Sequence, residues 1–224
     1  MSAIVLTIGG SVILSEELES SYFEKLANLL KITSKKYKLF IVVGGGNVAR
    51  RYIKLGRELG FSEDILDLIG IDITRINAKF LSNILTDSNN KIPYTTDEAI
   101  KVDKSIVIMG GTTPGHSTDM VGAEIAEKIH SELFIIATNV DGIYDKDPNK
   151  YSDAKQIKEI EIEKLIKSFG TQWKKAGKNM VVDGPALKIV KRAKLTTYVL
   201  NGKKLDQLKK ALNFQPFDGT KITV

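Results

Sequence analysis

Residues 39–51 read LFIVVGGGNVARR, an apolar run followed by three glycines and the first turn of a helical pattern. Five consecutive apolar residues bounded by glycine are typical of a strand that is buried on both faces of a parallel sheet. Glycine lets backbone N–H groups come close to an anion, and the start of the following helix adds a favourable dipole. The segment therefore predicts a strand, an anion-binding turn and a helix, with Arg50 able to reach a phosphate.

Four more apolar runs have the same character, and most of them end in glycine or a polar turn. They are Ala3–Ile8, Ser105–Met109, Leu133–Ala137 and Thr196–Leu200. Amphipathic helical patterns cover residues 22–30, 48–59, 65–81, 121–129, 185–193 and 205–212. Strands that alternate with helices predict an α/β fold, a three-layer αβα sandwich around a mostly parallel β-sheet. We expect one domain over residues 1–224, with two lobes that divide near residue 130.

The composition is that of an ordinary globular chain, with 224 residues, 42% of them hydrophobic and 27% charged. No apolar run approaches the roughly 20 residues of a membrane-spanning helix, and no basic leader precedes the first apolar run. Cysteine is absent and the two histidines are not at metal-ligand spacing, so we expect neither disulfides nor a thiolate metal site. These features predict a cytoplasmic enzyme with no membrane partner.

The charge of the chain is basic but dispersed. The net charge is +6, and the lysines are scattered along the sequence without a nucleic-acid-binding motif. We therefore expect no nucleic acid partner. The charge fits either a solvated basic surface or a site for small phosphorylated anions.

Three further polar segments follow predicted strands. They are residues 7–11 (TIGGS), 110–119 (GGTTPGHSTD) and 138–148 (TNVDGIYDKDP). Ligands of open α/β sheets bind outside the carboxyl ends of the strands, where all of these turns would lie. Each segment also has a purely structural interpretation, as a tight turn, a helix cap at Ser117 or Thr118, or a solvated hairpin around Tyr144.

Glycine-rich turns on several strands suit two anionic ligands that face each other. Phosphoryl transfer between two phosphorylated molecules requires this arrangement. An acceptor phosphate is already nucleophilic, so positioning and charge neutralisation do the catalysis without a general base. The absence of a Ser/His/Asp set, a carboxylate pair or a metal cluster agrees with this chemistry.

Four segments together resemble the archaeal uridylate kinases of the amino-acid-kinase superfamily. They are VVGGGNVARRY (42–52), DLIGIDITRINA (67–78), MGGTTPGHSTDMVGA (109–123) and ATNVDGIYDKDP (137–148). The resemblance runs in order from residue 3 to about residue 192. It implies the amino-acid-kinase fold and transfer of the γ-phosphoryl group of ATP to UMP, giving UDP and ADP in pyrimidine biosynthesis. It also implies a homohexamer, assembled as a trimer of dimers.

The resemblance assigns roles to individual residues. The implied ATP site contains Thr7, Gly9, Gly10, Ser11, Gly46, Arg50, Thr138, Asn139, Tyr144 and Asp147. The implied UMP site contains Gly45, Asp67 on the ribose hydroxyls, Thr112, Thr113, Pro114, Gly115, His116, Ser117 and Thr118. The implied catalytic residues are Asp119, Arg50 and Lys188. We expect Mg²⁺ to be held by the nucleotide phosphates, without a metal site made by the protein alone. The acceptor would bind the lobe of about residues 1–130, and ATP the lobe of about residues 131–224.

Thr7 departs from the family pattern, because many members carry a lysine two residues before the first glycine. Lys188, five residues after Asp183, is the candidate substitute, and its alternative interpretation is a solvated helix lysine. The segment from Lys167 to Gly184 is rich in glycine and lysine, and we interpret it as a loop over a ligand.

Two other functions stay open at this stage. An isopentenyl phosphate kinase typically carries a histidine in its triple-glycine loop, but the residues that follow the glycines here, Asn47 to Arg50, include none. Its apolar acceptor would also need an apolar channel rather than Asp67. A nucleotide sensor without catalysis could use the same fold. Measurable kinase turnover would separate the sensor from an enzyme.

Overall fold

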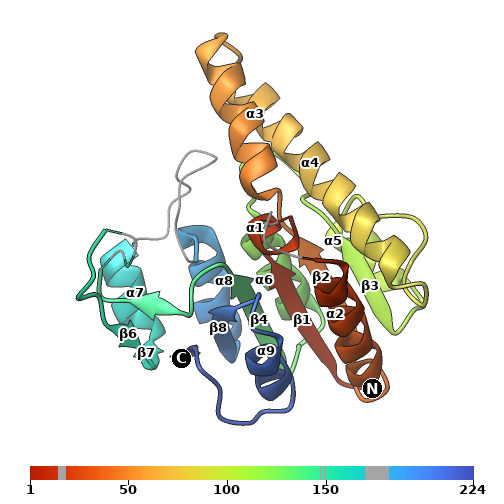
Figure 1. Cartoon of the computed structure of the whole chain (residues 1–224), viewed down its shortest axis with the longest axis vertical. Coiled ribbons are helices and arrows are strands. Elements are labelled where there is room, and N and C mark those ends of the chain that lie inside the picture. Colours follow the sequence, from red (N-terminus) through yellow and green to blue (C-terminus); the bar gives the residue numbers. More distant parts are fainter. Residues whose placement is uncertain (15–18, 147, 149, 170–181) are drawn as a thin grey trace.

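The structure, a computed structural model, describes residues 1–14, 19–146, 148, 150–169 and 182–224. Within these residues the centre is a seven-stranded sheet in the order β3–β2–β1–β4–β8–β9–β7 (Figure 1). The strands are β1 (Ala3–Ile8), β2 (Lys38–Val43), β3 (Ile106–Met109), β4 (Leu133–Thr138), β7 (Glu159–Glu161), β8 (Thr197–Asn201) and β9 (Thr220–Thr223). A separate hairpin pairs β5 (Ile143–Tyr144) with β6 (Gln156–Ile157).

The five predicted strands form the parallel part of the sheet, and the predicted fold class is confirmed. β1 pairs in parallel with both β2 and β4, and β3 and β8 extend the parallel sheet on either side. β9 runs antiparallel to β8, and β7 runs parallel to β9. The carboxyl ends of the five parallel strands therefore meet at one edge, where the polar segments emerge. The other four strands were not predicted because they are short and carry no continuous apolar run.

Helices cover both faces of the sheet and complete three layers (Figure 1). On one face lie α1 (Gly10–Ile13), α2 (Ser20–Thr33), α9 (Leu205–Leu212) and the C-terminal half of α4 (Glu63–Ile84). On the other face lie α5 (Thr96–Lys101), α6 (Thr118–Lys128), α7 (Ile162–Phe169) and α8 (Gly184–Ala193). Successive residues of β1 explain the layering, because Ile4 and Leu6 join the core of the first face and Val5 that of the second.

α3 (Gly46–Glu58) and the N-terminal half of α4 project beyond the sheet as a helical hairpin (Figure 1). A small cluster of Ala49, Ile53 and Leu66 joins the two helices. Both helices were predicted, but much of their apolar surface is exposed. We call this surface the apolar hairpin face; it comprises Val48, Tyr52, Leu55, Leu59, Phe61, Ile65 and Leu68. So many exposed apolar side chains on one projecting element are typical of a protein–protein contact.

Two expectations fall outside the described residues, in whole or in part. Asp147 of the implied ATP site is one, and residues 170–181 of the interpreted ligand loop are the other. The described flanks of that loop belong to α7, which ends at Phe169, and to α8, which begins at Gly184. In the described part of the chain, no helix combines the length and the apolar character needed to cross a membrane.

Candidate active site

The first two glycine turns touch each other at the carboxyl ends of β1 and β2. A Cβ atom on Gly10 would lie 2.3 Å from Gly46 N and 2.4 Å from Gly44 O. A Cβ atom on Gly46 would lie 2.7 Å from Ser11 N, and Gly46 has a φ of +66°. Both positions therefore require glycine. From the sequence we expected these glycines to contact a ligand, whereas close contact between the two turns already requires them.

The helix after the triple glycine opens towards the same place. α3 begins at Gly46 with Gly45 as its cap, and no described side chain bonds to its first N–H groups. Arg50 lies one turn into the helix, where its Nη2 donates a 2.7 Å hydrogen bond to Asn47 Oδ1. Partial burial lowers the pKa of Arg50, but a guanidinium stays protonated in proteins. The turn is therefore lined by free N–H groups and a fixed positive charge, which suits a phosphate.

The third glycine-rich segment joins β3 to α6 through residues 110–117, which we call the acceptor loop. Gly115 has a φ of +80°, and its N–H donates a 2.7 Å hydrogen bond to Asp67 Oδ2 of α4. The residue predicted to bind a ribose is thus bonded to the loop predicted to bind its phosphate. The loop and the start of α6 offer further exposed or partly exposed side chains, namely Thr112, Thr113, Pro114 and Thr118.

Two side chains of the acceptor loop turn inwards. Ser117 Oγ accepts a 2.9 Å hydrogen bond from Met120 N as the cap of α6, and it donates to Asp183 Oδ2. Its single proton is therefore engaged, and only its backbone N–H is left to donate to a phosphate. His116 Nδ1 is buried and has no hydrogen-bond partner among the described residues, although Glu124 Oε1 lies 3.5 Å away.

Asp119 lies where the end of β1 meets the start of α6. Its Oδ1 accepts a 2.7 Å hydrogen bond from Thr7 Oγ1. Burial, and then the charge of Asp183, raise the pKa of Asp119 to about 7, and the hydrogen bond from Thr7 opposes this shift. The pKa of Asp183 is also raised, mainly by burial. Two neighbouring carboxyl groups that resist ionisation would be stabilised in their charged forms by a cation.

The candidate cation from the sequence, Lys188, lies on α8 beyond Asp183. Asp183 caps α8 by accepting a 2.8 Å hydrogen bond from Ala186 N. Lys188 is exposed on the same helix. No hydrogen bond or ion pair among the described residues joins it to Asp119 or Asp183. A catalytic role for Lys188 therefore stays a prediction.

The predicted ATP-side segment lies on the other side of the opening turn. Gly9 N donates a 2.9 Å hydrogen bond to Ala137 O, which places the opening turn against the end of β4. Thr138 and Asn139 follow directly, and Tyr144 lies half-buried in β5. Of the described members of the implied ATP site, Thr7, Gly9, Gly10, Ser11, Thr138 and Asn139 therefore lie at the ends of β1 and β4, whereas Gly46 and Arg50 belong to α3 after β2 and Tyr144 belongs to β5.

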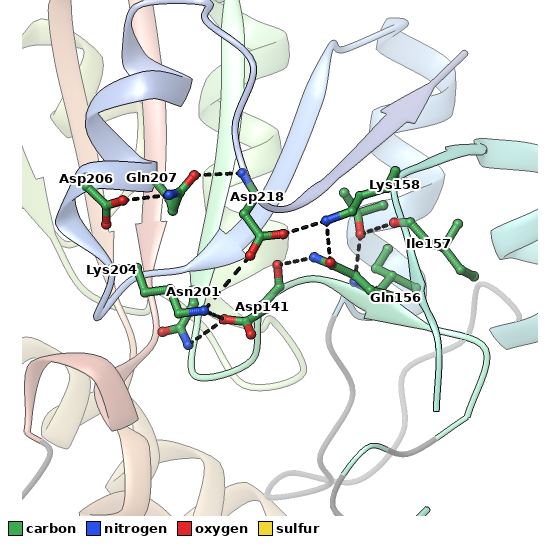
Figure 2. Close-up of polar contacts among 11 residues, drawn as sticks. Asp141, Gln156, Ile157, Lys158, Asn201, Lys204, Asp206, Gln207 and Asp218 are labelled. Carbon is green, nitrogen blue, oxygen red and sulfur yellow. Dashed lines mark hydrogen bonds and ion pairs between the residues drawn. The ribbon is translucent and has the colours of Figure 1, made fainter. Parts of the chain in front are cut away.

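A network of charged and amide side chains holds this segment in place (Figure 2). Lys204 Nζ lies 2.7 Å from Asp141 Oδ1 and 4.0 Å from Asp218 Oδ2. Asn201, at the end of β8, donates a 3.0 Å hydrogen bond to the same oxygen of Asp141. Lys158 forms an ion pair with Asp218 from the other side. The network therefore joins the loop after β4 to the start of α9 and to the segment before β9.

The β5–β6 hairpin, which carries Tyr144, is bound to the same support. Thr220 Oγ1 of β9 accepts a 2.8 Å hydrogen bond from Ile143 N and donates one of 2.6 Å to Ile157 O. Burial raises the pKa of Tyr144, and the charges of Asp141 and Asp218 raise it further. Tyr144 is thus close enough to the network for the charges of Asp141 and Asp218 to change its pKa.

Three residues of this region were missed as functional candidates: Asp183, Asp141 and Lys204. Asp183 is the cap of α8, and an aspartate shortly before Pro185 is a helix-start pattern that the sequence analysis did not use. No local sequence pattern indicates that Asp183 lies near Asp119, because this proximity depends on the packing of α8 against α6. Among the described residues, no group of three or more His, Asp or Glu side chains could hold a metal ion.

A parallel sheet with three glycine-rich turns at its carboxyl edge is the architecture of a phosphate-binding α/β protein. A model of the amino acid kinase family matches residues 2–201. The chain belongs to the amino acid kinase family.

Comparison with individual proteins shows which members of this family the chain resembles in sequence and structure. The uridylate kinase of Methanobrevibacter smithii is 44% identical over 222 residues, which cover 98% of each chain. The uridylate kinase of Methanocaldococcus jannaschii is 45% identical over 205 residues, covering 89% of this chain and 90% of the relative. The crystal structure of uridylate kinase from Archaeoglobus fulgidus has a TM-score of 0.87 and 38% identity, with all of both chains covered. Within the amino acid kinase family, the chain is one of the uridylate kinases.

Proposed function

We propose that this chain transfers the γ-phosphoryl group of ATP to UMP, which gives UDP and ADP in pyrimidine nucleotide synthesis. The observation that carries the proposal is the bond between Thr7 and Asp119, which joins the strand leading to the opening glycine turn to the helix that follows the acceptor loop. The two turns proposed to bind the donor and acceptor phosphates are thus linked through the carboxyl group of Asp119. The relatives described above support the choice of UMP as the acceptor.

The two substrates are assigned to opposite sides of this junction. UMP binds the acceptor loop, with its phosphate on the backbone N–H groups and hydroxyls and its ribose on Asp67. ATP lies along Gly9 to Ser11, with its base towards Tyr144. On this assignment the part of the chain up to about residue 130 carries the acceptor, and residues 131–224 carry most of the donor site.

The reaction proceeds by in-line transfer with electrostatic stabilisation. The acceptor phosphate is itself the nucleophile, so no residue has to remove a proton. Arg50 and the first N–H groups of α3 neutralise phosphate charge, and Asp119 orients the centre of the site. The paired carboxyl groups of Asp119 and Asp183 fit a divalent cation that is carried on the nucleotide phosphates, and Mg²⁺ would there neutralise phosphate charge.

We also propose that the chain forms a homohexamer, built as a trimer of dimers. The apolar hairpin face supports this proposal, because a second copy that covers it would remove several large apolar side chains from water. Light scattering of the purified protein tests the assembly. A monomer at micromolar concentration would contradict it.

The activity is tested by measuring ADP formation from Mg²⁺-ATP with UMP, dUMP, CMP, AMP and isopentenyl phosphate offered in parallel. A strong preference for UMP is expected. Turnover with isopentenyl phosphate alone would keep the fold and overturn the substrate. No turnover with any acceptor would favour a nucleotide sensor.

A further inference from the structure

Helix α4 presents polar side chains to two glycine-rich segments of the site. One is the acceptor loop, and the other is the triple-glycine turn, Gly44–Gly46. Asp67, Thr74 and Asn77 are separated by seven and three residues, which places them on one face of the helix. Asp67 has been described above. Thr74 is 7% exposed and Asn77 is 2% exposed, and the reaction as described gives neither a role.

Thr74 lies between the acceptor loop and the triple-glycine turn. Its Oγ1 accepts a 2.6 Å hydrogen bond from Gly111 N and donates one of 2.6 Å to Ile71 O. A Cβ atom on Gly110 would lie 2.6 Å from the same oxygen, so the loop rests directly on the helix. Thr74 Cγ2 lies 3.5 Å from the position of a Cβ atom on Gly45. One side chain therefore bonds to the acceptor loop and lies next to the triple-glycine turn.

Asn77 holds the triple-glycine turn. Its Nδ2 donates a 2.8 Å hydrogen bond to Gly44 O and a longer one of 3.4 Å to Gly45 O. Gly44 N donates in turn to Ile8 O at 2.8 Å, at the end of β1. The backbone of the turn is thus held by the helix on one side and by the strand on the other.

We propose that Thr74 and Asn77 are positioning residues, which set the separation between the acceptor loop and the triple-glycine turn. The proposal rests on the proposed function, because these two segments would hold the acceptor and donor phosphates. A helix is a rigid support, and misplacement of reacting groups by about 1 Å can cost about a hundredfold in rate. Thr74 acts on the acceptor side, whereas Asn77 acts on the turn that both substrates share.

The first test is Thr74→Val, which keeps the shape of the side chain and leaves the buried Gly111 N–H without a partner. Losing the hydrogen bond of this buried N–H group corresponds to a fall of about ten- to hundredfold in kcat/KM for UMP. We expect a higher KM for UMP together with a lower kcat, and a KM for ATP within about twofold of the unaltered protein. Thr74→Ser keeps the hydroxyl and should recover most of the loss.

Ser82→Ala is the matched control on the same helix. Ser82 is also 7% exposed, and its Oγ donates to Lys79 O at 2.9 Å, as Thr74 does to Ile71 O, but it bonds to neither glycine segment. Both KM values should stay unchanged in Ser82→Ala. If Thr74→Val lowers only kcat, in proportion to its unfolded fraction, its role is merely structural and the proposal is overturned.

Asn77→Asp tests the shared turn, because it replaces the donor that faces Gly44 O by an acceptor of the same shape. We expect the KM values for UMP and for ATP to rise together. A rise in one alone would contradict the assignment of Asn77 to both sides.

Amide hydrogen exchange in the unaltered protein gives a readout that needs neither a variant nor turnover. Slow exchange is expected at Gly111, whose N–H is bonded to a buried hydroxyl. Fast exchange there would overturn the proposal even if Thr74→Val does not fold. If the unaltered protein shows no turnover with UMP, the proposed function fails by itself, and the exchange rate still decides whether Thr74 holds the loop.

Discussion

Thr7 Oγ1 donates a hydrogen bond of 2.7 Å to Asp119 Oδ1, although the two residues lie 112 positions apart in the chain. Thr7 is 1% exposed and stands where many members of the family are expected to carry a lysine. A neutral hydroxyl donor therefore orients the central carboxyl group here. Under the proposed function, the positive charge of the site would come from Arg50, from helix N-termini and from the nucleotide's own cation, with Lys188 as a further predicted source.

Thr7→Val should lower kcat by about tenfold or more, because Asp119 loses the donor that orients it. Thr197→Val is the control, since Thr197 is equally buried and its Oγ1 donates at 3.0 Å to Leu195 O on β8, away from the site. Initial rates and unfolding temperatures of both variants would be compared. Equal losses of activity in the two would show that the bond to Asp119 has no special role.

The stability of the ligand-free protein should depend on pH through Asp119. Its pKa is raised from the ordinary value near 4 to about 7, so its contribution to stability is present below pH 4 and is lost as pH rises through 7. Asp119→Asn should therefore stabilise the protein more at pH 8 than at pH 5, with a difference on the order of 1–3 kcal/mol. Thermal unfolding at the two pH values measures it. A gain of the same size at both would contradict the raised pKa.

Asp67→Ala should weaken UMP binding in particular. The change removes the proposed ribose contact and the acceptor of the Gly115 N–H bond. We expect the KM for UMP to rise about ten- to hundredfold, while the KM for ATP is retained. Asp72→Ala is the control, because Asp72 is exposed on the same helix. An equal rise in both KM values would place Asp67 outside the acceptor site.

Lys204→Met should act on the donor side. The change removes the ammonium group between Asp141 and Asp218, which then repel each other next to Tyr144. Because the pairs are partly exposed, we expect only a several-fold rise in the KM for ATP, with no change for UMP. Lys221→Met, which breaks a 3.9 Å pair with Glu159 on β7, is the control. A change in the KM for UMP instead would show that the network does not support the donor site.

The parallel core could be predicted from the sequence because each of its strands is a continuous apolar run. β9 could not, since its residues alternate between polar and apolar and its place depends on Thr220 bonding to a distant hairpin. The same limit applies to helix α4, whose buried Thr74 and Asn77 look like ordinary polar helix residues until the loops they hold are seen.

The candidate site was predictable as a set of turns but not as a set of contacts. The glycines after β1 and β2 predicted turns at the carboxyl edge of the sheet, where the structure has them, and Gly10 and Gly46 are required there by a close approach between backbones far apart in the chain. Asp119 was predicted from the resemblance, whereas its neighbour Asp183 depends on the packing of two helices. Long-range pairing of this kind leaves no local pattern in a single sequence.

The central claim is tested most directly by following UDP formation from UMP and Mg²⁺-ATP by phosphorus NMR, for the unaltered protein and for Asp119→Asn. We expect the unaltered protein to form UDP and ADP in equal amounts. Asp119→Asn should remain folded, with a rate lower by about a hundred- to a thousandfold. No UDP from the unaltered protein, or an undiminished rate in Asp119→Asn, would contradict the account.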